Sequence, residues 1–468
     1  MIEIGDVTGD VIEVEVGSVA HGGSCVAHDN GRVVFVRHAL PGERVRARLT
    51  DTSHDRYWRA DAVEVLRASP ERVVPPCPHA GAGRCGGCDW QHASLVAQRR
   101  LKAEVVREQL RRLAGLDCPV EVEAVEALPA GLPPDVPPSD VSSPDVSSPD
   151  VSSPGAPQPG SLSGSPSSSD RSDEGLGWRT RMRYVLTEQG AVALRGHRSH
   201  EVVPAADCRI AHPLVRAAVA DRVFPVRDAG ETEVEVAASM SSGTAVVTQL
   251  PGPSASSSSS SSSGSEVETE IVEVVRDRRF RLGPGVFWQV HPGAPEVLVE
   301  AVLVGLAPRA GETALDLYAG AGLFAAALAE AVGPSGTVVA MESDPSAVAS
   351  AARSLADLPQ VSLRGVRVSP GSLRGLAATG ADVAVLDPPR AGAGRAVMQA
   401  LLALGPRAVA YVSCDPASLA RDLAVAAAQG YSLVTLRAFD LFPMTAHVEC
   451  VAILVNTPGG ERGTHAPA

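Results

Sequence analysis

A single cysteine, Cys414, lies where a reactive group could be presented by the fold. In YVSCDPASLARD, residues 411–422, Tyr411 and Val412 are typical of the end of a buried strand. The next residues, Asp415 and Pro416, are typical of a turn that opens a helix. A thiolate at such a place can act as a nucleophile. Cysteines at strand ends are also often small buried residues, so this stretch by itself leaves both interpretations open.

A glycine-containing turn, LDLYAGAGLF, predicts a cofactor site. Gly320 and Gly322 fall in the expected strand-to-helix turn, where missing side chains let a ligand approach the backbone. Glu342 ends the next strand about 20 residues later, where an acid can bind the hydroxyls of a ribose. No third glycine or basic residue follows in the sequence to hold a pyrophosphate. The turn therefore favours S-adenosylmethionine over NAD.

A second acidic motif, LDPPRAG (residues 386–392), should end at the same edge of the sheet. Asp387 follows a buried strand, and the carboxyl ends of parallel strands meet at one edge. Methyltransferases that act on amino groups usually carry an aromatic residue after the paired prolines, to stack on a base. This chain has Arg390 there, which argues against methylation of an exocyclic amine.

A cysteine cluster in CPHAGAGRCGGCDWQH indicates a metal or iron–sulfur site. Its three members are Cys77, Cys85 and Cys88. A C-x2-C pair with a third cysteine nearby needs a fourth ligand. His79 or His92 would suit zinc, whereas the distant Cys208 would suit an iron–sulfur cluster. The spacing does not decide between the two.

The elements that must position these residues divide the chain into three parts. Residues 1–70 alternate apolar and polar residues between Gly, Asn-Gly and Pro-Gly turns, which predicts a small OB-like β-barrel. Residues 71–285 form a central α+β part that carries the cysteine cluster, with Ser/Pro-rich insertions at 129–175 and 253–265 that we expect to be disordered. Residues 286–458 alternate strands and helices as in a doubly wound Rossmann-like domain.

Composition narrows the possible partners. The formal charge of −13 argues against wholesale coating of nucleic acid but allows a local basic groove. Arginines recur at alternate positions 179, 181 and 183, where three on one strand face could follow a phosphate backbone. No apolar run is long enough for a bilayer, and the first residues lack a secretory signal. We therefore expect a cytoplasmic protein without membrane contact, and a monomer.

Five motifs occur in the order FWQVHP, LDLYAGAGLF, LDPPRAG, YVSCDPASLARD and FPMTAHVEC. On the basis of these motifs, nearly the whole chain resembles the RNA uracil-5-methyltransferases that carry an N-terminal TRAM domain and a 4Fe-4S cluster. The resemblance implies a cluster held by Cys77, Cys85, Cys88 and Cys208. It implies an S-adenosylmethionine site lined by Gln289, Tyr318, Glu342 and Asp387. It also implies Cys414 as the nucleophile and Glu449 as the base, with His447 a less favoured base.

Some residues depart from the family pattern. The gap between Cys77 and Cys85 is longer than usual, His291 stands where Asn is common, and Leu323 replaces a frequent polar residue. Relatives modify ribosomal or transfer RNA, and the TRAM and cluster segments favour 23S ribosomal RNA, with transfer RNA as the alternative. A non-catalytic iron–sulfur RNA-binding protein and a methyltransferase for another substrate are the other hypotheses. The intact Cys414 and Glu449 argue against the non-catalytic one.

Overall fold

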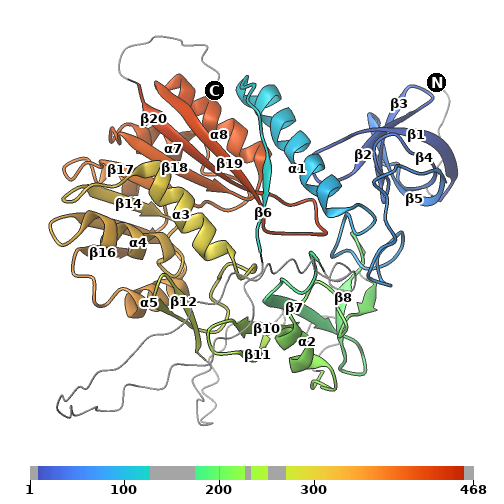
Figure 1. Cartoon of the computed structure of the whole chain (residues 1–468), viewed down its shortest axis with the longest axis horizontal. Coiled ribbons are helices and arrows are strands. Elements are labelled where there is room, and N and C mark those ends of the chain that lie inside the picture. Colours follow the sequence, from blue (N-terminus) through green and yellow to red (C-terminus); the bar gives the residue numbers. More distant parts are fainter. Residues whose placement is uncertain (1–8, 127–173, 200, 227–232, 251–269, 458–468) are drawn as a thin grey trace, which may run out of the picture.

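The computed structural model describes residues 9–126, 174–199, 201–226, 233–250 and 270–457. Most of the two Ser/Pro-rich insertions predicted from the sequence therefore lie outside the described residues. Three β-sheet units and a connecting helix make up this part of the chain (Figure 1). In the described residues, no helix is both long and apolar enough to cross a bilayer.

The N-terminal unit is a closed five-stranded barrel, which confirms the prediction from alternating residues. Its strands are β1 (Val11–Val19), β2 (Cys25–Asp29), β3 (Arg32–Arg37), β4 (Arg44–Asp51) and β5 (Tyr57–Arg67), in the order β1-β2-β3-β5-β4. Inward-facing residues of β4, such as Val45, Ala47 and Leu49, are almost fully buried, while the arginines between them are exposed. This period of two is what a strand with one buried face requires.

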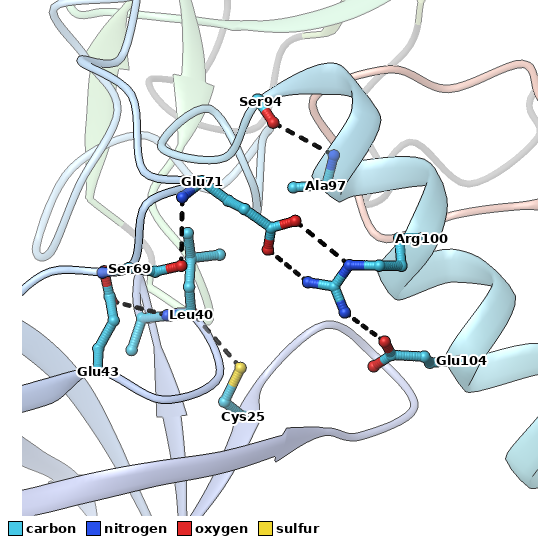
Figure 2. A network of polar contacts seen from close by, with 10 residues as sticks. Cys25, Leu40, Glu43, Ser69, Glu71, Ser94, Ala97, Arg100 and Glu104 are labelled. Carbon is cyan, nitrogen blue, oxygen red and sulfur yellow. Dashed lines mark hydrogen bonds and ion pairs between the residues drawn. The ribbon is translucent and has the colours of Figure 1, made fainter.

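Helix α1 (Leu95–Gln109) joins the barrel to the C-terminal unit. Ser94 caps its first turn by accepting a hydrogen bond from the amide of Ala97 (3.2 Å), and one further turn, η1 (Leu110–Ala114), has π-helical geometry. One face of α1 packs in the barrel core and another packs in a core of the C-terminal sheet. Arg100 of this helix pairs with Glu71, which follows the barrel, and with Glu104, one turn further along the same helix (Figure 2).

The central unit is an antiparallel sheet with a short helix and a separate hairpin. The sheet runs β11 (Thr244–Leu250), β10 (Glu233–Ser239), β7 (Arg181–Leu186), β8 (Val192–Arg195) and β9 (Val202–Pro204). The helix is α2 (Pro213–Val219), and the hairpin pairs β12 (Ile271–Val275) with β13 (Arg278–Leu282). The hairpin leads directly into the segment that carries Gln289.

The C-terminal unit has the predicted doubly wound fold, and its sheet contains eight strands. Its order is β16 (Val361–Gly365), β15 (Thr337–Glu342), β14 (Thr313–Leu317), β17 (Val383–Leu386), β18 (Ala408–Ser413), β20 (Glu449–Asn456), β19 (Tyr431–Asp440) and β6 (Val122–Ala124). The helices between them are α3 (Ala294–Leu306), α4 (Leu323–Val332), α5 (Pro345–Ser354), α6 (Pro370–Arg374), α7 (Arg395–Leu402) and α8 (Pro416–Ala428). Large apolar cores lie on both faces of the sheet.

Strand β6 comes from the segment that the sequence assigned to the central part. It pairs in parallel with β19 at the edge of the C-terminal sheet, so α1 and β6 both pack with this unit. The order of the strands reverses at β14, which has β15 on one side and β17 on the other. Ligands of doubly wound folds bind at the carboxyl ends of the strands at such a switch point.

Candidate active site

A cavity of about 1290 Å³ opens at this switch point. Seven of the residues predicted from the sequence line it: Gln289, Tyr318, Gly320, Glu342, Asp387, Cys414 and Glu449. They come from the ends of β14, β15, β17 and β18, from the start of β20, and from the segment that enters α3. Residues that lie up to 160 positions apart in the sequence thus share one site.

One end of the cavity is built by the turn after β14 and the end of β15. Tyr318 and Gly320 both have positive φ angles, 65° and 53°, and a side chain on Gly320 would meet no atom within 4 Å. The carboxylate of Glu342 accepts hydrogen bonds from the amides of Gly320 (2.9 Å), Ser343 (2.6 Å) and Asp344 (2.8 Å). This end presents open backbone and a fixed carboxylate, the features that bind a ribose.

Gly322, the second glycine of the turn, was predicted to bind the cofactor, but it lies outside the cavity lining. It precedes α4 with a φ of 91°. A β-carbon at Gly322 would lie 2.8 Å from Leu355 Cδ1. Glycine is therefore needed there for the turn and for close packing of the helix.

The other end of the cavity gathers a thiol and two acids. Cys414 directly follows β18, and Glu449 begins β20, the antiparallel neighbour of β18. Burial raises the pKa of Asp387 to about 7, and burial together with Asp387 raises the pKa of Glu449 well above its ordinary value. Burial and the charge of Glu449 raise the pKa of Cys414 to about 12, against the opposing effect of Arg390. Each of these shifts favours the protonated form of its group.

Two basic side chains lie beside these acids. Arg390 Nη2 lies 3.2 Å from Nε2 of His447, and both residues line the cavity. Burial and Arg390 lower the pKa of His447 to about 4, so its imidazole is neutral at pH 7. A group with so low a pKa is a weak proton acceptor, which favours the carboxylates over His447 as the base.

A second, smaller cavity of about 230 Å³ is lined by all four cysteines of the predicted cluster, Cys77, Cys85, Cys88 and Cys208. Two sulfur atoms accept hydrogen bonds: Cys85 from the amide of Gly87 (3.4 Å) and Cys88 from the side chain of Gln91 (3.3 Å). His79 also lines this cavity, whereas the buried His92 does not. Across the part of the chain that the structure describes, no three His, Cys, Asp or Glu side chains are grouped closely enough for a metal ion.

The arginines expected to follow a phosphate backbone are used differently from one another. Arg181 donates to the carbonyl of Val286, and Arg183 pairs with Glu235 (3.1 Å). Only Arg179 of the three lines the large cavity.

Two features of the site could not be predicted from the sequence. Asp415, next to the cysteine, pairs with His21 of the barrel (2.8 Å), and Gly22 lines the cavity.

Comparisons with known proteins agree with this arrangement. The TRAM domain family matches residues 7–63, and the tRNA (Uracil-5-)-methyltransferase family matches residues 378–457. An uncharacterized RNA methyltransferase of Streptomyces avermitilis is 45% identical over 95% of this chain and 98% of its own. The 23S rRNA (uracil(1939)-C(5))-methyltransferase RlmD of Chromohalobacter salexigens is 32% identical over 97% of this chain and 91% of its own.

A solved structure supports the fold. The tRNA (uracil-54, C5)-methyltransferase of Pyrococcus abyssi, in complex with S-adenosyl-L-homocysteine, has a TM-score of 0.61 at 21% identity and covers 94% of this chain and 99% of its own. The fold and site thus define an S-adenosylmethionine-dependent methyltransferase with a TRAM domain. The chain belongs to the RNA uracil-5-methyltransferase family.

Proposed function

We propose that this enzyme methylates carbon 5 of one uridine in 23S ribosomal RNA through a covalent adduct on Cys414. The observation that carries the proposal is the single cavity that combines an expected ribose site at Glu342 with Cys414, Asp387 and Glu449. Ribosomal RNA is favoured by the 32% identical relative, whose name gives 23S rRNA. Transfer RNA is the second candidate, because the family matched by residues 378–457 is named for it.

The chemistry follows from the reactivity of uracil. Carbon 5 is too weak a nucleophile to take a methyl group directly, so the thiolate of Cys414 first adds to carbon 6 and makes carbon 5 electron-rich. Bound S-adenosylmethionine supplies the electrophilic methyl group. Glu449 then removes the proton of carbon 5, and the bond from carbon 6 to sulfur breaks to release the thiolate and restore the ring.

Proton transfer in this scheme uses the two buried acids. The ionised member of the pair Asp387 and Glu449 accepts the thiol proton, which must pass to solvent before Glu449 can take the proton of carbon 5. Arg390 favours the anionic forms of both Cys414 and Glu449. The uridine must leave its base stack to reach these groups inside a cavity.

We also propose that Cys77, Cys85, Cys88 and Cys208 hold a 4Fe-4S cluster with a structural role. Four thiols that converge on one cavity are a suitable donor set. A tetrahedral zinc site would hold its sulfur atoms about 3.8 Å apart, given Zn–S bonds of about 2.3 Å. Within the described residues no three such side chains are grouped closely enough for a single metal ion, and the choice of an iron–sulfur cluster rests on the resemblance to the family. Colourless anaerobic protein with stoichiometric zinc would overturn this assignment.

The adduct is tested with RNA that carries 5-fluorouridine. Fluorine cannot leave as a cation, so the enzyme should remain bound to the RNA in a complex that survives denaturation. Cys414→Ala should abolish the complex, whereas Glu449→Gln should form adducts with normal RNA and release them slowly. Cys118→Ala is the matched control, because Cys118 does not line the cavity. An adduct that maps to another cysteine would exclude the mechanism.

The target is tested separately by mapping 5-methyluridine in ribosomal and transfer RNA from cells with and without the gene. Loss of one 5-methyluridine from 23S rRNA alone is the expected result. Loss from transfer RNA alone would replace the ribosomal proposal with the second candidate.

A further inference from the structure

The reaction cavity and the four-cysteine cavity share a wall. Three residues line both of them: Gly86, Gly87 and Arg179. The two glycines lie between Cys85 and Cys88, so the C-x2-C turn itself forms part of the reaction cavity. A β-carbon at Gly86 would lie 2.7 Å from the amide nitrogen of His197, so this turn packs closely against its neighbour.

Residues 177–180 connect the cysteine site to the reaction site through backbone hydrogen bonds. On one side the amide of Arg179 donates to the carbonyl of Ile210 (2.8 Å), two residues after Cys208. On the other side the amide (2.8 Å) and the hydroxyl (2.9 Å) of Thr180 donate to the carbonyl of Val290, the residue after Gln289. Residues 179 and 180 therefore link the segment that carries Cys208 to the segment that carries Gln289 by hydrogen bonds.

A second connection runs from the C-x2-C turn to the segment that carries the acid. The amide of Asp89, next to Cys88, donates to the carbonyl of Met444 (3.0 Å). The carboxylate of Asp89 accepts from the amide of Ala446 (3.1 Å), three residues before Glu449. The four-cysteine site is thus hydrogen-bonded both to the segment that carries Gln289 and to the segment that leads to Glu449.

The side chain of Arg179 is the charged group at this shared wall. Its Nε donates to the carbonyl of Arg181 (3.2 Å), which fixes the start of the guanidinium. Its neighbours Arg181 and Arg183 are engaged with Val286 and Glu235, which leaves Arg179 as the arginine of this series that lines the reaction cavity.

We propose that Arg179 is a positioning residue that binds a phosphate of the target RNA next to the flipped uridine, and that the four-cysteine site holds it in place from behind. The inference rests on the proposed action on RNA. A guanidinium that is held on one side and lines the cavity on the other can form charge-assisted hydrogen bonds to phosphate oxygens.

The first test compares Arg179→Gln and Arg179→Lys with Arg183→Gln. The control, Arg183, has the same charge and lines the cysteine cavity but not the reaction cavity. We measure the Kd of a uridine-containing RNA oligonucleotide at several salt concentrations, the Kd of S-adenosylmethionine, and the visible absorption of anaerobic protein. Arg179→Gln should weaken RNA binding about 10-fold or more and reduce the salt slope by about 1, with cofactor affinity and absorption unchanged.

Lysine at position 179 should restore part of the affinity and the salt slope, because it keeps the charge but loses the fork of donors. Arg183→Gln should change the RNA Kd less than 3-fold. Unchanged RNA affinity and salt slope in Arg179→Gln would overturn the proposal. So would an equal loss of cofactor affinity, because that would indicate general damage to the cavity.

The second test addresses the coupling. Cys208→Ser, or wild-type protein treated with an iron chelator if that variant does not fold, should lose RNA affinity and keep cofactor affinity. Adding Arg179→Gln should cause little further loss, because both changes act on one interaction. Fully additive losses would refute the coupling. If the Arg179 results hold but no 5-methyluridine is formed, the proposed function fails while the RNA contact stands.

Discussion

The only lysine of the chain, Lys102, provides a sharp test of how the domains hold the active site. Its side chain is completely buried in α1, with Nζ 2.5 Å from Oδ1 of Asp440 and 3.0 Å from the carbonyl of Phe442. The side chain of Asp440 is 2% exposed. The pair joins the helix that follows the cysteine cluster to the start of the loop that leads to Glu449. Lys102→Met keeps the length of the side chain and leaves an uncompensated buried carboxylate.

Removing one partner of a buried ion pair costs about 3–5 kcal/mol, much more than a surface pair. For a domain of this size that corresponds to a fall in Tm of about 6–20 °C. Replacing both residues, in Lys102→Met with Asp440→Leu, should restore most of the loss, because no unpaired charge remains. The carbonyl of Phe442 keeps the hydroxyl of Thr445 as a donor (2.8 Å), so it is not left unsatisfied.

Urea unfolding followed by tryptophan fluorescence measures these differences, since Trp90 and Trp178 are 1% and 2% exposed and lie near the loop. A loss below about 1 kcal/mol in Lys102→Met, or a double variant as unstable as the single one, would refute the reasoning. Either result would mean that water or rearrangement compensates Asp440.

Two further predictions concern contacts around the cavity. Glu342→Gln keeps an acceptor for the amide of Gly320 but loses the charge. Calorimetry should therefore show S-adenosylmethionine binding weakened about 10- to 100-fold. An unchanged Kd would mean that Glu342 only stabilises the turn and does not bind the cofactor. His21→Ala should cost less than about 1 kcal/mol, because His21 is 41% exposed. The hydrogen bond to Asp415 raises the pKa of His21. The stabilisation from this pair is therefore fully present below about pH 6.5 and is lost as pH rises through the raised pKa. A difference in unfolding free energy between wild type and His21→Ala that does not change between about pH 5 and 9 would contradict this.

The parts of the site that could be predicted from the sequence are those that one sheet edge brings together. Gly320, Asp387 and Cys414 each follow a buried strand, and Glu342 is the last residue of one. Parallel strands place their carboxyl ends side by side, so local motifs were enough to predict a shared cavity. Cys208 was one of three candidate fourth ligands, with His79 and His92, and only the resemblance to a family singled it out, because more than a hundred residues separate it from residues 77–88.

The parts that could not be predicted depend on packing between distant segments. Gly322 has the spacing of a cofactor glycine, but its space is filled by Leu355, which lies 33 residues later. Arg183 continues an alternating series, yet it is paired with glutamates from the neighbouring strand β10. Nothing near His21 in the sequence indicates Asp415 as its partner. In each case the tertiary neighbour decides the role, and periodicity does not reveal it.

The charges of the cavity suggest why the methyl donor and the base act in order. In the free protein, burial raises the pKa of Asp387 and Glu449, so the folded state retains protons there that the unfolded chain would lose. Both acids therefore contribute stability at low pH that is lost as pH rises through their raised pKa values, which for Asp387 is about 7. On the proposed assignment, a sulfonium cation bound beside Asp387 lowers the pKa of both carboxyls. Cofactor binding would then release protons and favour the carboxylate that the reaction needs, whereas in the free protein the raised pKa values of Cys414, Asp387 and Glu449 favour their protonated forms.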